Sequence, residues 1–426
     1  MGGDPVIEAV RRGDDDAVRV LLAGGADPEA VDGRGVSALC LAVAAFDSSA
    51  AGHLVEAGAD ALRRLPDWST PLLRAVDSGS VALVIEVLGG APLDGAAGAE
   101  LLARARLWHE RGPVAVLRER TGASGPVEYG RVRDRDGVSW CHEVRLGGSA
   151  VHDGHAGVLT LLEEHLGLRP GVGELAGRAC ALEHPDGEHA SWLQIVGTLA
   201  GRQDDATWLA AAALRAHPDP LRRRFGAQVL ASLHLGGYRH GTRSPFLERA
   251  RELFLDWGAA EEHPDVLAEV LGGLAPFRDP RIQPLGLARL GHPAPQVRAR
   301  VAALLESTPS RGLERWTYTP EGLDAMLRLA RDPDAGVRED AVYQLADRKD
   351  PSPAVGDALA AALDDEEQDI RIWAVFGLAE RDDPRCVEGA GRVGAVADRA
   401  ARAWILDAPA RFERRRRERE AAAASE

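Results

Sequence analysis

The pattern of apolar and polar positions from about residue 170 onward predicts a series of short amphipathic helices. Apolar residues recur with helical periodicity over segments of roughly a dozen residues, and short turns rich in aspartate and proline separate these segments. Clear examples of such turns are 217–220, 331–334 and 382–384. Because the turns are short, we expect consecutive helices to pack as antiparallel pairs.

The N-terminal part of the chain repeats itself at a fixed interval. Ala9, Ala42 and Ala75 are evenly spaced, and the same register aligns the Gly-Ala-Asp triplets 25–27 and 58–60. A period of this length is typical of repeat proteins, in which each unit buries its apolar face against the next. We therefore expect a stack of helical units over residues 1–107.

The segment 70–75, Thr-Pro-Leu-Leu-Arg-Ala, is the best copy of a recurring signature, of which 37–42 is a looser copy and 4–9 a worn one. Thr or Ser caps a helix, Pro in its first turn costs no hydrogen bond, and small Ala allows close packing. Gly25 and Gly58 are expected to end the second helices in a left-handed conformation. The period and signature resemble the ankyrin repeat, with about three units.

The resemblance to ankyrin repeats implies a binding surface for a protein partner. Its expected residues are Arg74 and Asp77 on an inner helix and Arg34, Asp67 and Trp68 at the finger tips. Trp68 stands where the family usually has glycine, so the finger geometry is expected to depart from the family there. The indole is either a binding hot spot or packs against the adjacent finger.

The C-terminal half has its own repeat. Segment 334–341 aligns with segment 367–374, and Leu-Ala pairs recur at the same place in both units. This pattern is similar to the HEAT repeat in the short form of phycobilin-lyase-like proteins. The resemblance implies five or six units over 171–400. In the family an arginine pairs with an acidic residue of a neighbouring turn. Arg298, Arg338 and Arg371 are the matching arginines, with Arg222 as a looser match; the acidic partners open to them are Asp334, Asp364 and Asp365.

Aromatic residues supply further candidates for partner contact. About seven extra residues interrupt the C-terminal repeat near 310–318, and such insertions form loops on one face. Trp316 and Tyr318 in this loop either contact a partner or pack back on their own repeat. Tyr343, Trp373 and Phe376 fall on the inner side of two repeats, where they either bind a partner or lie under a final capping helix.

Between the two arrays the helical pattern breaks. Residues 127–146 read as a β-hairpin with a Gly-containing turn, which either plugs the junction of the arrays or presents a binding edge. The same region gathers histidines and cysteines, but their spacing fits no zinc motif, so we expect no metal site. They are Cys141, His142, His152, His155, Cys180, His184 and His189.

Composition narrows the class of partner. The formal net charge of −15 disfavours nucleic acid and anionic membranes. Four scattered cysteines indicate neither a disulfide framework nor a zinc module, and no apolar stretch is long enough to span a membrane. Basic residues are almost all arginine, with Lys349 as the single lysine, which suggests a GC-rich bacterium. Because the sequence shows neither a membrane span nor a signal-peptide pattern, we expect a cytoplasmic location. The Arg-rich tail at 411–419 is either a nucleic-acid hook or a solvated helix end.

The sequence as a whole predicts an all-α solenoid with a small β-hairpin insertion. The predicted segments are 1–107, 108–170, 171–400 and a capping helix with tail over 401–426. Motifs for phosphate binding, nucleotide binding and hydrolytic catalysis are absent, so a non-catalytic scaffold that binds a protein or peptide without a cofactor is the expected function. The alternative is a HEAT-like enzyme, such as a DNA glycosylase or a lyase, or a nucleic-acid-binding protein.

Overall fold

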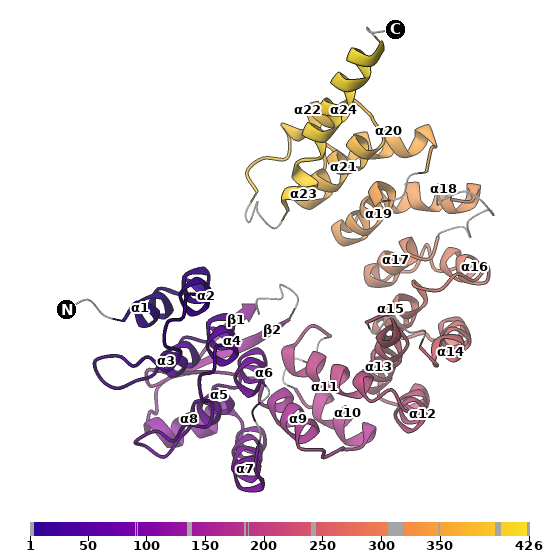
Figure 1. The fold of residues 1–426 in the computed structure, drawn as a ribbon. Helices are drawn as coiled ribbons and strands as arrows, with labels where there is room; N and C mark the ends of the chain where they lie inside the picture. The colour runs from indigo at the N-terminus through magenta and orange to yellow at the C-terminus, as the bar shows by residue number, and fades with distance from the viewer. Residues whose placement is uncertain are drawn as a thin grey trace. The chain divides into compact units, whose positions relative to one another are not determined.

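The computed structural model describes the chain except residues 1–3, 90, 92, 134–138, 183–184, 186, 240–243, 306–317, 348–349, 397–401 and 424–426. It divides into two compact units, Met1–Ala211 and Ala212–Glu426. Both units are built mainly from short helices, and the first also holds a three-stranded sheet (Figure 1). The predicted all-α architecture with a small sheet insertion is confirmed. The segment boundaries at 107, 170 and 400 stay predictions.

The first unit begins with helix pairs joined by tight turns. Its helices are α1 (Pro5–Arg12), α2 (Asp15–Ala23), α3 (Ala38–Ala44), α4 (Ser48–Glu56), α5 (Pro71–Ser78), α6 (Val81–Leu88), α7 (Gly95–Arg111), α8 (Pro113–Thr121), α9 (His155–His165), α10 (Val172–Cys180), α11 (Ala190–Gly201) and α12 (Asp205–Ala213). Alternate helices pack on one another, so that α1, α3 and α5 form one row and α2, α4 and α6 form another.

The expected capping chemistry is present in these pairs. The side chain of Thr70 accepts a hydrogen bond from the backbone N–H of Leu73 at 3.0 Å, and Pro71 occupies the first turn of α5. Gly25 and Gly58 have φ values of 88° and 104°, as the sequence predicts. These caps satisfy backbone groups that a short helix would otherwise leave unpaired.

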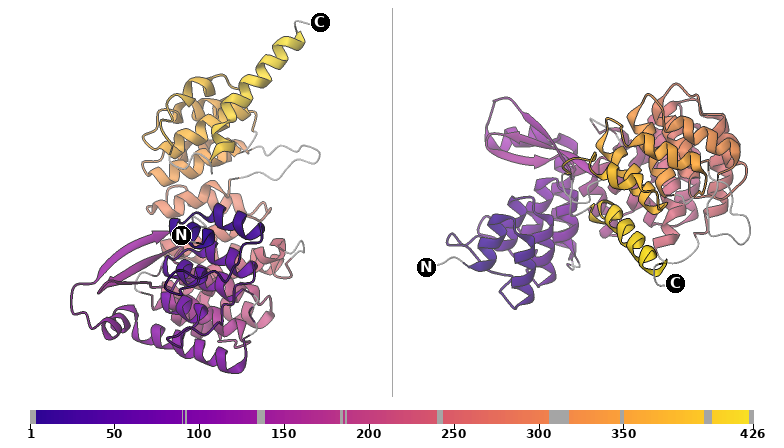
Figure 2. Two further views of the ribbon diagram at one scale, coloured as in Figure 1. Left: turned by 60° about the vertical axis from the view of Figure 1, so that its left-hand side comes forward. Right: turned by 90° about the horizontal axis from the view of Figure 1, so that it is seen from above.

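The predicted hairpin is part of a larger sheet with strand order β1-β2-β3. Its strands are β1 (Glu128–Arg133), β2 (Trp140–Leu146) and β3 (Ser149–His152), and both pairings are antiparallel. Glu128 pairs with Arg145 and Arg133 with Trp140. One face of β2 and β3 packs against α7 and α8 through a buried cluster around Trp108. The hairpin extends away from the helices of the first unit in the view from above (Figure 2).

The second unit continues the pairing of helices. Its elements are a 3-10 turn (Leu214–Ala216), α13 (Pro220–Arg239), α14 (Leu247–Ala260), α15 (Pro264–Leu274), α16 (Ile282–Leu287), α17 (Pro295–Ala302), α18 (Pro320–Leu329), α19 (Ala335–Asp347), α20 (Pro353–Ala362), α21 (Gln368–Glu380), α22 (Arg385–Ala390), α23 (Ala403–Leu406) and α24 (Ala408–Ala423). Helices α13, α15, α17, α19 and α21 stack as one row, beside a second row that contains α14, α16, α18 and α20 (Figure 1).

Within the described residues, no helix has the length and apolar character needed to cross a membrane. The cytoplasmic location stays a prediction. Cys40, Cys141, Cys180 and Cys386 are all free thiols, and the first, second and fourth are buried.

A buried histidine makes the second unit sensitive to acid. His234 on α13 is fully buried beside Phe254 and Phe277, with ring centroids 6.2 and 4.8 Å away. Burial lowers its pKa to about 4, because desolvation disfavours the imidazolium. Below a pH of about 6.5 the unfolded chain therefore binds a proton that the folded chain does not, and the free energy of unfolding falls as the pH drops toward 4.

We expect His234 to cost about 3 kcal/mol of stability between pH 7 and pH 4. In urea unfolding of the full chain, His234→Leu should flatten this decline and remain folded at neutral pH, because an apolar side chain of similar size fits the aromatic pocket. An unchanged decline in the variant would contradict the assignment.

Candidate interaction surfaces

Trp68 lies at the tip of the loop between α4 and α5, residues 61–70, which we call the Trp68 loop. Its side chain is 80% exposed, the largest exposure among the large apolar side chains of the described residues. Its backbone adopts φ 64°, a left-handed conformation that bulky residues avoid. Gly35, at the equivalent position of the preceding repeat, adopts φ 78°. The loop therefore holds a large indole in a backbone position that suits glycine.

Hydrogen bonds and ion pairs fix the Trp68 loop on both sides. On one side Arg64 donates to the carbonyl oxygen of Trp68 at 2.8 Å and forms an ion pair with Glu100 of α7 at 2.7 Å. On the other side Asp67 accepts from the hydroxyl of Ser69 at 2.6 Å and from Arg74 at 3.0 Å. A loop held in this way presents the indole without a further ordering cost.

The charges of the loop are ionised at neutral pH. Hydrogen bonds from the side chain and backbone of Ser69, with a smaller contribution from Arg74, lower the pKa of Asp67 to about 2. Arg34 lies in the preceding loop, where its backbone N–H donates to Asp32 at 2.8 Å and its side chain is exposed. Four of the five predicted ankyrin-type candidates, Arg34, Asp67, Trp68 and Arg74, thus lie in or beside two adjacent loops.

Asp77, the fifth candidate, has an internal structural role. Its carboxylate accepts from the indole N–H of Trp108 at 2.6 Å, from Arg104 at 3.0 Å and from Arg120 at 2.9 Å. These donors come from α7 and α8, so Asp77 links three helices. A carboxylate with this many partners has little capacity left for a ligand, and we leave Asp77 out of the proposed surface.

Three histidines of the connecting region make contacts between the sheet and neighbouring elements. Asp153 accepts from the backbone N–H of His142 and lies 3.0 Å from Nδ1 of His142 and 3.1 Å from Nε2 of His189. His155 is buried and stacks on Trp108 at 4.5 Å, and burial lowers its pKa to about 4. Among the described residues, no group of histidine, cysteine, aspartate and glutamate side chains is arranged to hold a metal ion. His184 lies outside the described residues.

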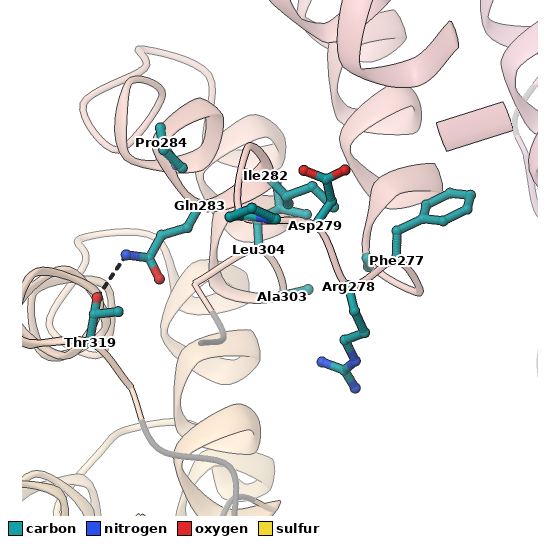
Figure 3. A pocket seen from close by; sticks show the side chains of 11 residues that line it. Phe277, Arg278, Asp279, Ile282, Gln283, Pro284, Ala303, Leu304 and Thr319 are labelled. Carbon is teal, nitrogen blue, oxygen red and sulfur yellow. Dashed lines mark hydrogen bonds between the residues drawn. The ribbon is translucent and has the colours of Figure 1, made fainter. Parts of the chain in front are cut away.

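A cavity of about 180 Å³ lies between α15, α16 and the start of α18 (Figure 3). Gln283 donates to the hydroxyl of Thr319 across it at 2.7 Å, and Phe277 lines another wall. Its volume is below the range of roughly 300–1,000 Å³ that small-molecule sites occupy. We therefore interpret this cavity as a gap in the packing of these helices and not as a ligand-binding site.

The aromatic candidates of the second unit form a cluster. The ring of Tyr343 on α19 lies 4.7 Å from that of Trp373 on α21, and Trp373 lies 6.0 Å from Phe376. Trp404 on α23 lies 5.2 Å from Phe376 and 6.3 Å from Trp373. Tyr343 remains 38% and Trp404 55% exposed. The cluster thus lies partly under α23 and partly open to solvent.

Tyr318 is anchored within the second unit. Its backbone N–H donates to Asp350 at 2.9 Å and its hydroxyl donates to the carbonyl oxygen of Gln344 at 3.3 Å. Trp316 lies outside the described residues, so its candidacy stays a prediction.

A ladder of arginines joins successive helix pairs of the second unit. Arg298 forms an ion pair with Asp332 at 2.7 Å, and Arg338 forms one with Asp365 at 2.8 Å. Each arginine also donates to the carbonyl oxygens five and six residues before it. Arg371 repeats the carbonyl contacts and donates to the carbonyl oxygen of Arg392.

Some details of the predicted ladder were wrong. The equivalent contact near α13 belongs to Arg223, which pairs with Glu261 at 3.0 Å, and not to Arg222. Asp334 caps α19 through the backbone N–H of Val337, and Asp364 pairs with Arg392. Arg222, Asp334 and Asp364 each lie one or two residues along the chain from the residue that makes the ladder contact. The sequence pattern alone does not distinguish between such near neighbours.

Residues 287–379 match the family model described as HEAT repeats. This segment begins in α16, ends in α21 and contains the ladder arginines Arg298, Arg338 and Arg371. The expectation of HEAT repeats in the C-terminal half is thereby confirmed for these residues. A search of curated proteins finds no match to the chain.

Two similar solved structures are both distant. One is the YibA protein of Escherichia coli, with 16% identity, a TM-score of 0.40, and coverage of 57% of this chain and 93% of that one. The other is Kap121p, with 13% identity, a TM-score of 0.40, and coverage of 95% of this chain. The present chain spans 44% of the length of Kap121p.

Helix α24 packs on the end of the helix stack of the second unit. Phe412 of α24 is buried against the core of the second unit. Arg415 and Arg419, four residues apart on α24, both pair with Asp382, at 3.2 and 2.7 Å. Three tail arginines, Arg411 included, therefore meet acidic side chains at the end of α21.

Two residues that contribute to these sites were not identified from the sequence. Trp404 joins the aromatic cluster from a segment expected only to cap the stack, and its sequence signal is a tryptophan in the short apolar run 403–406. Asp153 organises two histidines from different elements, but in the sequence it is one carboxylate in a Gly-rich turn.

Proposed function

We propose that this protein is a non-catalytic helical-repeat scaffold that binds another protein through the Trp68 loop. The observation that carries the proposal is the exposed indole of Trp68 in a left-handed backbone conformation, fixed by ion pairs on both sides. Backbone strain of this kind costs about 1–2 kcal/mol and persists at sites where it contributes to function. Tryptophan is also the residue most enriched at binding hot spots.

The surroundings of Trp68 support a macromolecular partner. Arg34, Asp67 and Arg74 provide charges of both signs within two neighbouring loops, a composition typical of the polar rim around a hot spot. We propose further that the capped helix pairs of residues 1–107 are ankyrin repeats, whose finger loops would include the Trp68 loop. The short phycobilin-lyase-like type of the HEAT repeats also stays a proposal.

Affinity capture from an extract of the source organism tests the proposal. The immobilised full-length protein should retain a specific protein that Trp68→Ala binds at least about 30-fold more weakly, because hot-spot tryptophans contribute about 2 kcal/mol or more. Tyr129→Ala is the matched control, since Tyr129 is 55% exposed on β1 of the same unit. Equal retention by the Trp68 variant, or retention of nucleic acid alone, would overturn the proposal.

A further inference from the structure

A partly exposed aromatic surface on the second unit has a distinctive charge environment. We call it the aromatic–acidic face. It comprises the rings of Tyr343, Trp373, Phe376 and Trp404 and the carboxylates of Glu339, Asp340 and Asp369. Glu339 and Asp340 precede Tyr343 on α19 by four and three residues, so they lie within one helical turn of its ring. Asp369 precedes Trp373 on α21 by four residues in the same way.

The carboxylates of this face differ from those of the arginine ladder. Arginine partners help to lower the pKa values of Asp332 and Asp365. In contrast, burial raises the pKa of Glu339, and the nearby charges of Asp369 and Asp340 raise it further. Burial also raises the pKa of Asp340. Arginine contacts thus outweigh the effect of burial at the ladder carboxylates but not at Glu339 and Asp340.

Among the described residues, nearby arginines offset this effect only in part, since the pKa values of Glu339 and Asp340 stay raised. Arg338 and Arg371 lie on the same two helices, but the ladder directs their guanidinium groups to Asp365 and to backbone carbonyls. Arg402 of the chain's own C-terminal segment donates to Asp369. Arg300 is the cation that acts on Asp340.

The chain itself shows which chemistry fits the face. Arg402 meets Asp369 while Trp404, two residues later, packs on Trp373 and Phe376. A short segment with a cation beside an aromatic side chain therefore already covers one edge. The remainder of the face offers Tyr343, which is 38% exposed, for stacking with a cation and the half-buried carboxylates of Glu339 and Asp340 for ion pairing.

We propose that the aromatic–acidic face binds an extended segment rich in arginine or lysine from a partner protein. The aromatic rings and carboxylates come from three helices, α19, α21 and α23, so a segment with several cations can contact them together. Cation–π contacts and charge complementarity would both contribute to affinity. This surface lies in the second unit, and its binding does not depend on Trp68.

Fluorescence anisotropy of a labelled peptide of alternating arginine and alanine, titrated with the full-length protein, tests the proposal. The double variant Asp340→Asn with Tyr343→Ala should bind the peptide roughly tenfold more weakly, as expected from the loss of one charge contact and one cation–π contact. The matched control is Asp256→Asn with Tyr129→Ala, which removes one exposed carboxylate and one exposed ring elsewhere.

Trp404→Ala, a change at an exposed position, provides a second variant and should also weaken binding. Trp68→Ala should leave peptide affinity unchanged, which separates this proposal from the proposed function. Equal loss in the matched control would show that net charge alone attracts the peptide and would overturn the proposal. Binding of an alternating glutamate–alanine peptide with similar affinity would overturn it as well.

Discussion

Substitution of Gly79 by alanine is expected to destabilise the first unit by about 4 kcal/mol. Gly79 ends α5 with φ 69°, where an L side chain is strained. A Cβ atom at this position would lie 2.1 Å from the carbonyl oxygen of His152 and 2.5 Å from the ring of His155. The backbone carbonyl cannot rotate away as a flexible side chain does, so β3 and α9 would have to shift.

Gly13 provides a control that separates conformation from crowding. It ends α1 with φ 63°, in the same left-handed conformation, but a Cβ atom there meets no atom within 4 Å. Gly13→Ala should therefore cost only about 1 kcal/mol. Urea unfolding of both full-length variants, with hydrogen exchange to locate the loss, measures the difference. Similar losses for the two variants would contradict the close contact between α5 and β3.

The close contact at Gly79 could not be predicted from the sequence. Gly13 and Gly79 occupy the same position in their repeats, and both end a helix in the left-handed conformation. The crowding at Gly79 comes from His152 and His155, which lie far later in the chain. A local sequence pattern contains no information about a neighbour that lies so far away along the chain.

Local patterns predicted the elements well. The regular periods of the two arrays predicted helix pairs, and the alternation in 127–146 predicted two strands with almost their observed bounds. The third strand, Ser149–His152, was missed because it is short and follows Gly147 and Gly148 in a stretch that reads as a loop. Short strands depend on pairing with a neighbour more than on their own sequence.

The candidate sites depended on tertiary contacts to different degrees. Trp68 was identifiable because it breaks a repeat at a glycine position, a purely local signal. Asp77 was named as a surface residue, but Arg104, Trp108 and Arg120 from later helices occupy its carboxylate. The repeat register predicts which row of helices a residue belongs to. It does not predict which hydrogen-bond donors from other helices contact its side chain.

Substitution of Trp68 by glycine is expected to weaken partner binding strongly while leaving the fold equally or more stable. The backbone at φ 64° suits glycine, and the indole is 80% exposed, so little packing is lost. Relief of strain offsets the added flexibility of glycine in the unfolded chain, so the free energy of unfolding should stay constant or rise by up to about 1 kcal/mol. Binding should weaken by roughly 30-fold or more, as for a hot-spot tryptophan.

Phe46→Gly is the matched control for strain. Phe46 also has a positive φ, 55°, but its ring stacks on His152 at a centroid distance of 4.2 Å. Its replacement should therefore lower the free energy of unfolding, because the lost stacking outweighs the relieved strain.

The measurement that tests the central claim most directly pairs the unfolding free energy of Trp68→Gly with its retention of the captured partner. We predict a variant that is at least as stable as the parent protein and no longer retains the partner. A variant that keeps the partner, or that loses both stability and binding, would contradict the claim that the loop holds Trp68 in a strained position for recognition.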